Sequence, residues 1–242
     1  MKRKTNDRCI TCLYSRILET KVPDKKITNR TLHREIDLLK KMFIDLGALV
    51  EDRLRKACII IETADKDLAE DIIRTDNEID HMEVQIEEEC LKVLALHQPV
   101  AGDLRLIIAI IKINSELERI GDMAVGIAKR VQVIRKDNAS FTLDYTPMAV
   151  KVLGMIKMSL DALLTENADF ARRIFIEDEE VDALRNKAYE ALVEQLDTKP
   201  GHAAALLNMY LLARHLERIG DRACNIAEEV IYLVEGDIVR NE

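Results

Sequence analysis

The sequence predicts an all-α protein made of two tandem homologous three-helix bundles, the product of an internal duplication. Three observations lead to this fold class. Glycine and proline together make up about 5% of the 242 residues, less than half of their average share, so tight turns are scarce. Apolar residues form 48% of the chain and recur at helical spacing. A six-residue motif occurs twice. The same composition excludes a turn-rich β-sandwich or barrel and a disordered chain.

Residues 1–30 read as a basic N-terminal extension, which we expect to be a solvated or disordered tail. It carries nine basic and three acidic residues, a net charge of +6, so the chain total of −8 leaves −14 on residues 31–242. A body this acidic argues against nucleic-acid binding. Cys9 and Cys12 have half of the spacing of a zinc site. No second cysteine or histidine pair completes it, so we predict no metal or redox site there.

The first repeat is predicted to span residues 31–138 and to contain three helices. Leu39, Phe43 and Leu46 illustrate the apolar spacing of its first helix, which is that of one buried helical face. Breaks between these helices are short, which favours antiparallel neighbours in a bundle. The helices are expected at about 32–63, 66–96 and 102–135, followed by a linker at 136–140.

The second repeat, residues 139–242, shows the same order of elements. Pro99 and Pro200 precede the last helix of the first and the second repeat respectively. These positions fit the exclusion of proline from helix interiors. The helices of this repeat are expected at about 145–165, 168–197 and 201–235.

Two pairs of matching segments reveal the duplication. The motif LERIGD occupies residues 117–122 and returns 99 residues later at 216–221. Upstream, the acidic segment 76–80 is echoed 102 residues later at 178–182. A short loop deletion explains the change in offset, so we interpret the two halves as homologous repeats.

The repeated acids share a position on their helices. At 100° per residue, Glu118 and Asp122 lie close to Ile107 and Ile111, whereas Arg119 falls on the polar side. The other copies follow the same pattern. The helical pattern therefore predicts eight carboxylates directed inward or at an interface: Asp76, Asp80, Glu118, Asp122, Asp178, Asp182, Glu217 and Asp221. The polar side is predicted to carry His215, Arg218 and Arg222.

Carboxylates gathered on a partly apolar surface require compensation. Those at i and i+4 lie about 6 Å apart on one helix face, repel one another and are costly to desolvate. Arginine or lysine partners, shared protons or multivalent cations can each compensate them. An oxygen-only ligand set suits Mg²⁺, Mn²⁺, Ca²⁺ or iron. From the residues alone, a metal site and a solvated acidic face with arginine partners stay open as alternatives.

Other motifs and the cysteines bear on activity and location. Glu78 and His81 have the Glu-x-x-His spacing of di-iron bundles, but they occur once and on the polar face, so we interpret them as a coincidence. The sequence contains no glycine-rich phosphate loop and no pattern of a nucleophile with its base, which argues against an enzyme. No apolar run approaches the ~20 residues of a membrane span, so no membrane insertion is predicted. Cys58, Cys90 and Cys224 lie in apolar helical patterns and favour a reducing, cytoplasmic location.

On these motifs the chain resembles the PhoU family, the phosphate-uptake regulators of bacteria. The resemblance rests on both acidic segments, on both LERIGD motifs and on three further segments, and it covers about residues 31–240. The further segments are Cys90–Pro99, Asp103–Arg105 and Asn225–Glu228.

The resemblance implies multinuclear metal clusters of iron or zinc, with manganese, magnesium or nickel as alternatives. It assigns one cluster to Asp76, Asp80, Glu118 and Asp122, and the other to Asp178, Asp182, Glu217 and Asp221. The chain departs from the pattern at three positions, which weakens the expected ligand sets. Gly126 and Lys129 stand where the second repeat has Asn225 and Glu228, and Arg185 replaces the counterpart of Glu83.

The resemblance also implies a homodimer that acts as a negative regulator of phosphate uptake and of the phosphate-starvation response. Its expected partners are the ATPase of the phosphate ABC transporter and its sensor histidine kinase. No catalytic residue is predicted. The alternative is a metal-dependent hydrolase or oxidase that uses the carboxylate clusters, which would need an open coordination position and a placed acid or base. A helical scaffold whose acids only pair with arginines is a third alternative.

Overall fold

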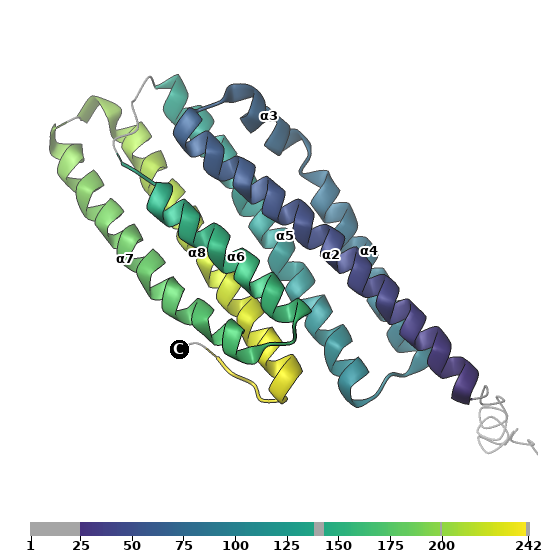
Figure 1. Ribbon diagram of the computed structural model, residues 1–242. Coiled ribbons are helices and arrows are strands. Elements are labelled where there is room, and N and C mark those ends of the chain that lie inside the picture. The colour runs from purple at the N-terminus through teal and green to yellow at the C-terminus, as the bar shows by residue number, and fades with distance from the viewer. Residues whose placement is uncertain (1–24, 138–142, 199, 241–242) are drawn as a thin grey trace, which may run out of the picture.

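The computed structural model describes residues 25–137, 143–198 and 200–240, and within them every regular element is helical. The predicted linker lies partly outside these residues, and Cys9, Cys12 and most of the basic extension lie wholly outside them. The elements are α2 (Lys25–Thr63), α3 (Lys66–Arg74), α4 (Asn77–His97), α5 (Ala101–Lys136), α6 (Thr146–Leu164), α7 (Ala168–Thr198), the 3₁₀ turn η1 (Pro200–His202) and α8 (Ala203–Glu235). Figure 1 shows the longer helices as rods packed side by side with nearly parallel axes. The predicted all-α class is confirmed.

Both repeats turn from their first to their second helix in the same way. Ala64 and Glu166, 102 residues apart, adopt left-handed φ values of 50° and 49°. In the first repeat, Asp65 then caps α3 by accepting the backbone N–H groups of Asp67 and Leu68. The side chain of Asn167 similarly accepts from the backbone of Phe170. An acceptor side chain at this position satisfies a free N–H of the first helical turn. The breaks predicted from the sequence are therefore present in both repeats.

The first repeat differs from the prediction at its second helix, which is divided into α3 and α4. Arg53, only 3% exposed on α2, points its guanidinium at the break and donates to the backbone carbonyls of Thr75 and Asp76. Thr75 also bonds through its hydroxyl to Asp71 O. These carbonyls also accept the backbone N–H groups of Glu78 and Ile79, three residues on, so the buried cation adds a second donor to each carbonyl at the break. In addition, α2 begins at Lys25, inside the segment predicted as the extension.

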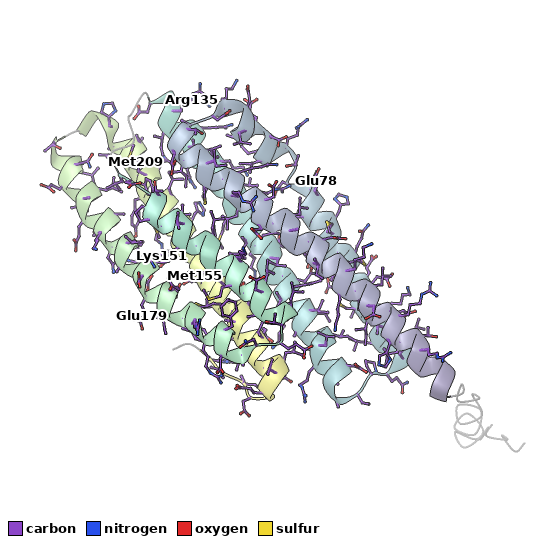
Figure 2. The ribbon with its side chains drawn as sticks, in the orientation of Figure 1. Glu78, Arg135, Lys151, Met155, Glu179 and Met209 are labelled. Atoms are coloured by element: carbon purple, nitrogen blue, oxygen red, sulfur yellow. The ribbon has the colours of Figure 1, made fainter. Side chains whose placement is uncertain are left out.

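The second repeat has the three helices predicted, with α7 continuous over 31 residues. Tyr145, just before α6, is buried and donates through its hydroxyl to Met209 O of α8 at 2.7 Å. Met155 lies on α6, where Figure 2 labels it, and only 1% of its surface is exposed. It stands 102 residues after Arg53, the offset that relates the starts of α3 and α7. A neutral, apolar residue therefore lies where the first repeat has its buried cation.

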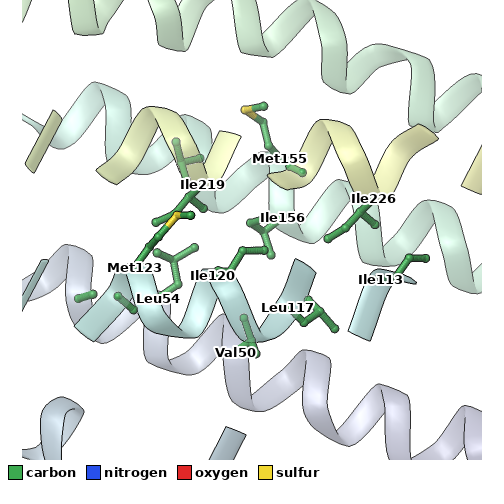
Figure 3. Close-up of a cluster of buried hydrophobic side chains, with 14 of the residues drawn as sticks. Val50, Leu54, Ile113, Leu117, Ile120, Met123, Met155, Ile156, Ile219 and Ile226 are labelled. Carbon is green, nitrogen blue, oxygen red and sulfur yellow. The ribbon is translucent and has the colours of Figure 1, made fainter. Parts of the chain in front are cut away.

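The two repeats join along α5 and α8, which make the most extensive helix contact in the described structure. Pairs of residues across this seam run in opposite directions: Lys112 bonds Glu229, whereas Arg130 bonds Asn208. The two helices are thus antiparallel, and the equivalence of residues 99 apart relates the repeats by a pseudo-twofold axis across the seam. Ile113, Ile120 and other buried side chains from α2, α5, α6 and α8 form one continuous core (Figure 3). In the part of the chain described, no helix has the length and apolar character needed to cross a membrane.

Candidate functional site

The structure brings the four predicted acids of the first repeat together at the α4–α5 pair. Asp76 lies at the α3–α4 break, Asp80 one turn later, and Glu118 and Asp122 on α5. Burial raises the pKa of Asp76, and repulsion from Asp80 and Asp122 raises it further, against the lowering effect of Arg53. Burial likewise raises the pKa of Glu118, and Asp122, Asp80 and Glu83 add to the shift. The four carboxylates are thus close enough to repel one another, and we call them the α4–α5 cluster.

The second repeat brings its four acids together in the same way, at the α7–α8 pair. Asp178 and Asp182 come from α7, and Glu217 and Asp221 from α8. Burial, with repulsion from Asp221, raises the pKa of Asp178 to about 6. Burial also raises the pKa of Glu217 and of Asp221. We call this group the α7–α8 cluster.

The predicted inward orientation is correct for part of each set. Glu217 is buried, with 6% of its surface exposed. By contrast, Asp80, Asp122 and Asp182 are exposed to solvent. A helical wheel places a residue around one helix axis only, whereas burial depends on how close the neighbouring helix comes. These three carboxylates lie at the margin of the helix contact. The prediction that they point inward is therefore wrong for Asp80, Asp122 and Asp182.

The glycine repeated in the two LERIGD motifs has a steric reason. A Cβ on Gly220 would lie 2.7 Å from Oδ1 of Asp178, and one on Gly121 would lie 2.8 Å from Cδ1 of Ile79. Both distances are shorter than van der Waals contact. The glycines therefore allow α4 to approach α5 and α7 to approach α8. In the second repeat, the Asp178 carboxylate occupies the space that a side chain on residue 220 would need.

The two clusters differ in their counter-charges. In the α7–α8 cluster, Oε1 of Glu217 accepts from Arg214 at 2.6 Å, and Arg185 stands 3.6 Å from the same oxygen. Arg185 also lies 3.8 Å from Asp182. The first repeat has Glu83 and Ser115 at the positions of these arginines. Arginine pairing, one of the two alternatives left open by the sequence, therefore describes the α7–α8 cluster.

The α4–α5 cluster has a more distant cation. Arg53 approaches Asp76 to 3.7 Å, and it shares its charge with Glu78 at 3.5 Å. Lys129 also lowers the pKa of Asp76, but its effect is smaller than that of Arg53. The counterpart of Gly126 in the second repeat, Asn225, donates through its amide nitrogen to Glu116 across the α5–α8 seam.

The donor set of both clusters fits a hard cation, with one geometrical condition. Within the described residues, no three Asp, Glu, His or Cys side chains converge on one point as placed. A cation would therefore have to draw the carboxylates together by side-chain rotation, which the exposed Asp80, Asp122 and Asp182 are free to make. In addition, Oε2 of Glu217 is buried and has no hydrogen-bond partner, an acceptor that a cation would satisfy.

Sequence reasoning missed two members of these sites. Cys224, predicted only as a buried thiol, hydrogen bonds to Asp178, and burial raises the pKa of the thiol. The sequence feature that could have identified Cys224 as part of this site is its alignment with Glu217 on the apolar stripe of α8. Arg53 gave no signal, because nothing in its local pattern marks a contact with a helix break 22 residues away. Glu78 and His81 are both exposed and join neither cluster among the residues described.

Comparison with known proteins identifies close relatives over most of the chain. The PhoU domain family matches residues 43–131 and again 146–230. The phosphate-specific transport system accessory protein PhoU homolog of Pseudomonas aeruginosa is 36% identical over 88% of this chain and 89% of its own length. PhoU of Escherichia coli is 34% identical over 86% of each chain.

Solved structures give the same result. The crystal structure of PhoU from Pseudomonas aeruginosa superposes with a TM-score of 0.81, at 36% identity, over 85% of this chain and 99% of that one. The phosphate transport system regulatory protein PhoU from Streptococcus pneumoniae gives a TM-score of 0.79 at 31% identity, over 88% of this chain and all of that one. The two family matches correspond to the two repeats of the fold.

Proposed function

The chain belongs to the PhoU family, and from this premise we propose that it is a regulator of phosphate uptake rather than an enzyme. Two relatives carry names that tie them to phosphate transport, as an accessory and as a regulatory protein. The observation that carries the proposal is the pair of carboxylate clusters, one in each repeat, on a helical frame that this chain shares with those relatives. The regulation proposed is negative: the protein restrains uptake and the phosphate-starvation response when phosphate is plentiful.

The proposed cofactor is a multinuclear metal cluster at one or both acidic sites. Asp76, Asp80, Glu118 and Asp122 would hold metal in the first repeat, with Glu83 beside them. Asp178, Asp182, Glu217 and Asp221 would hold it in the second. Of iron and zinc, iron is better matched to a set of carboxylate oxygens, and the Cys224 thiol adds a softer donor in the second repeat only. Bound cations would supply positive charge that fixes the helix pairs and screens the repelling acids.

The proposed partners are the ATPase of the phosphate ABC transporter and the sensor histidine kinase, which the protein would meet as a homodimer in the cytoplasm. An acidic body favours basic docking surfaces on such partners. The test is a phosphate-starvation reporter in cells that lack this chain. We expect these cells to express the reporter even at high phosphate. Reintroducing the wild-type chain should repress the reporter again. A reporter that stays silent without the chain would contradict negative regulation.

Metal binding is tested by elemental analysis after purification without chelators. We expect stoichiometric transition metal in the wild type and its loss from the α4–α5 cluster in the double variant Glu118→Ala, Asp122→Ala. The matched control is Glu88→Ala, Glu190→Ala, which removes two exposed acids outside both clusters. Absence of metal from the wild type, or equal loss in the control, would contradict the proposal. Turnover of a phosphate ester that depends on Glu217 and Asp221 would instead favour the hydrolase.

A further inference from the structure

A groove of about 370 Å³ opens on the α5–α8 seam, beside the pseudo-twofold axis. Its lining contains more cations than carboxylates, in a chain with a net charge of −8. The lining residues are Arg119, Asp122 and Met123 from α5, and His215, Arg218 and Arg222 from α8. The sequence predicted the three polar residues of α8 on the solvent side. His215 and Arg222 are partly buried instead, because α5 packs against that side.

The two arginines of the LERIGD motifs meet in this groove. Arg119 and Arg218 occupy the same motif position, 99 residues apart, so the pseudo-twofold axis brings both guanidinium groups to one opening. Neither cluster of acids uses them as an ion-pair partner in the described structure. From farther away, Arg119 lowers the pKa of Glu118 and Arg218 lowers that of Asp221, so the repeated arginine acts on the adjacent acids and also lines the groove.

Among the described residues, the carboxylate of Glu116 is the one that forms close ion pairs with arginines of the groove, namely Arg119 and Arg222. Glu116 alone accepts from Arg119 at 2.8 Å and from Arg222 at 3.1 Å, and one carboxylate cannot neutralise two cations. The Nε of Arg222 is buried and has no hydrogen-bond partner. Arg218 makes no ion pair within the part of the chain described, and it is exposed. Asp122 is the single carboxylate in the lining.

The floor of the groove is shaped by a close contact between the repeats. A Cβ on Gly126 would lie 2.8 Å from Cε1 of His215, so the imidazole packs against α5 at this glycine and a larger residue would displace it. The Nδ1 of His215 is buried without a hydrogen-bond partner. Met123, which is buried, completes an apolar edge. Two unpartnered, buried nitrogens, those of His215 and Arg222, thus belong to residues that line the groove.

We propose that this groove binds the phosphate group of a small anion, with Arg119 and Arg218 as the principal ligands and Arg222 as the third. A planar guanidinium presents paired N–H donors that match two phosphate oxygens, and three such groups suit a divalent anion better than a carboxylate. The site lies outside the metal ligands proposed above, apart from Asp122, which borders both. It therefore extends the proposed function and does not depend on metal binding.

The test is a calorimetric titration of the full chain with inorganic phosphate, pyrophosphate and ADP, with acetate as the monovalent reference. We expect saturable binding of at least one phosphate compound, and affinity reduced roughly tenfold or more in Arg119→Gln, Arg218→Gln, since each change removes charge-assisted hydrogen bonds. The matched control is Arg173→Gln, an exposed arginine of α7 outside the groove. Tighter binding of pyrophosphate or ADP than of phosphate would identify a larger ligand as the natural source of the group.

A second variant tests the sign of the electrostatics. Asp122→Asn removes the one carboxylate of the lining and is expected to increase the affinity for the anion several-fold in chelator-treated protein. Failure of the wild type to bind all three phosphate compounds, or equal affinity in the wild type and the double arginine variant, would overturn the proposal. An intact response of the starvation reporter in that case would leave the proposed regulatory function standing.

Discussion

The α4–α5 and α7–α8 clusters carry the same acids at equivalent positions, yet they are neutralised differently. Glu217 of the second repeat is held by Arg214 and approached by Arg185. In the first repeat, Glu83 stands at the position of Arg185 and adds a further negative charge to the site. Duplication therefore preserved the ligand-like residues while their surroundings changed. If the clusters bind cations as proposed, the comparison predicts tighter binding at the α4–α5 cluster, because less of its charge is compensated by the protein itself.

The backbone differs between the repeats for a related reason. In the first repeat a buried arginine, Arg53, lies against a helix break, and in the second Met155 lies against a helix that continues. The side chain of Met155 lies near Gly220, with its Cε 3.5 Å from the place of a Cβ there. Arg53 donates to the carbonyls at the break, whereas Met155 has no charged group to donate and lies against α8 at Gly220. The residue at this position of the first helix thus differs between the repeats together with the second helix: Arg53 occurs with a divided helix and Met155 with a continuous one.

The largest effect on stability is expected when Arg53 of the first repeat is replaced by methionine, the residue at the equivalent position of the second repeat. Arg53→Met removes the buried donor to Thr75 and Asp76, leaving their carbonyls without this partner and Asp76 without its nearest cation. We expect a loss of roughly 2–3 kcal/mol in the free energy of unfolding, measured in urea. Arg55→Met, at an arginine whose side chain is 54% exposed, is the control and should cost no more than about 0.5 kcal/mol. Equal effects of the two changes would contradict the role given to Arg53.

An exchange of charge between the clusters is expected to exchange their cation affinities. Arg185→Glu should raise the affinity of the α7–α8 cluster for Mn²⁺, and Glu83→Arg should lower that of the α4–α5 cluster. The expected change is about tenfold, or about 1.4 kcal/mol. Each cluster is measured alone by removing the Glu and Asp of the other LERIGD motif. Arg173→Glu, elsewhere on α7, controls for net charge. An Arg185→Glu variant that binds no tighter than this control would refute the comparison.

The smallest effect is expected on the pH dependence of stability. The pKa of Asp178 is raised to about 6 in the folded protein, against about 3.9 when unfolded, so its charged form destabilises the fold above pH 6. This cost is relieved as the pH falls from 6 to 4, because the folded state then takes up the proton first. Without cations, Asp178→Asn should therefore stabilise by on the order of 1 kcal/mol at pH 7.5, since partial exposure reduces the effect, and not at all near pH 4.

The control for this measurement is Asp169→Asn on the same helix, whose side chain is 95% exposed. Its effect should be small and nearly independent of pH. Chemical unfolding of the three proteins between pH 4 and 8, in the presence of a chelator, gives the difference directly. A stabilisation by Asp178→Asn that is constant with pH would show that packing, and not charge, is responsible.

Much of the fold could be predicted because its signals are local. Apolar spacing and scarce turns identify long helices, and the two copies of LERIGD identify the repeat, since each is a property of neighbouring residues. The acids of both clusters were found for the same reason, as were the turns that follow Thr63 and Leu164. These features depend on helix periodicity, which is fixed by the backbone whatever its neighbours are.

Only the tertiary structure decided which acids are compensated and which residues face one another across the seam. The break at Asp76 depends on Arg53 from another helix, and the groove depends on two arginines 99 residues apart. Arg119 and Arg218 are exposed, as their positions on the helical wheel predict, but a wheel describes one helix and cannot show that the two side chains meet across the seam. The sequence by itself thus determined the helices, the duplication and the carboxylates. Packing determined their exposure and electrostatics, because burial and charge pairing arise between helices and not within them.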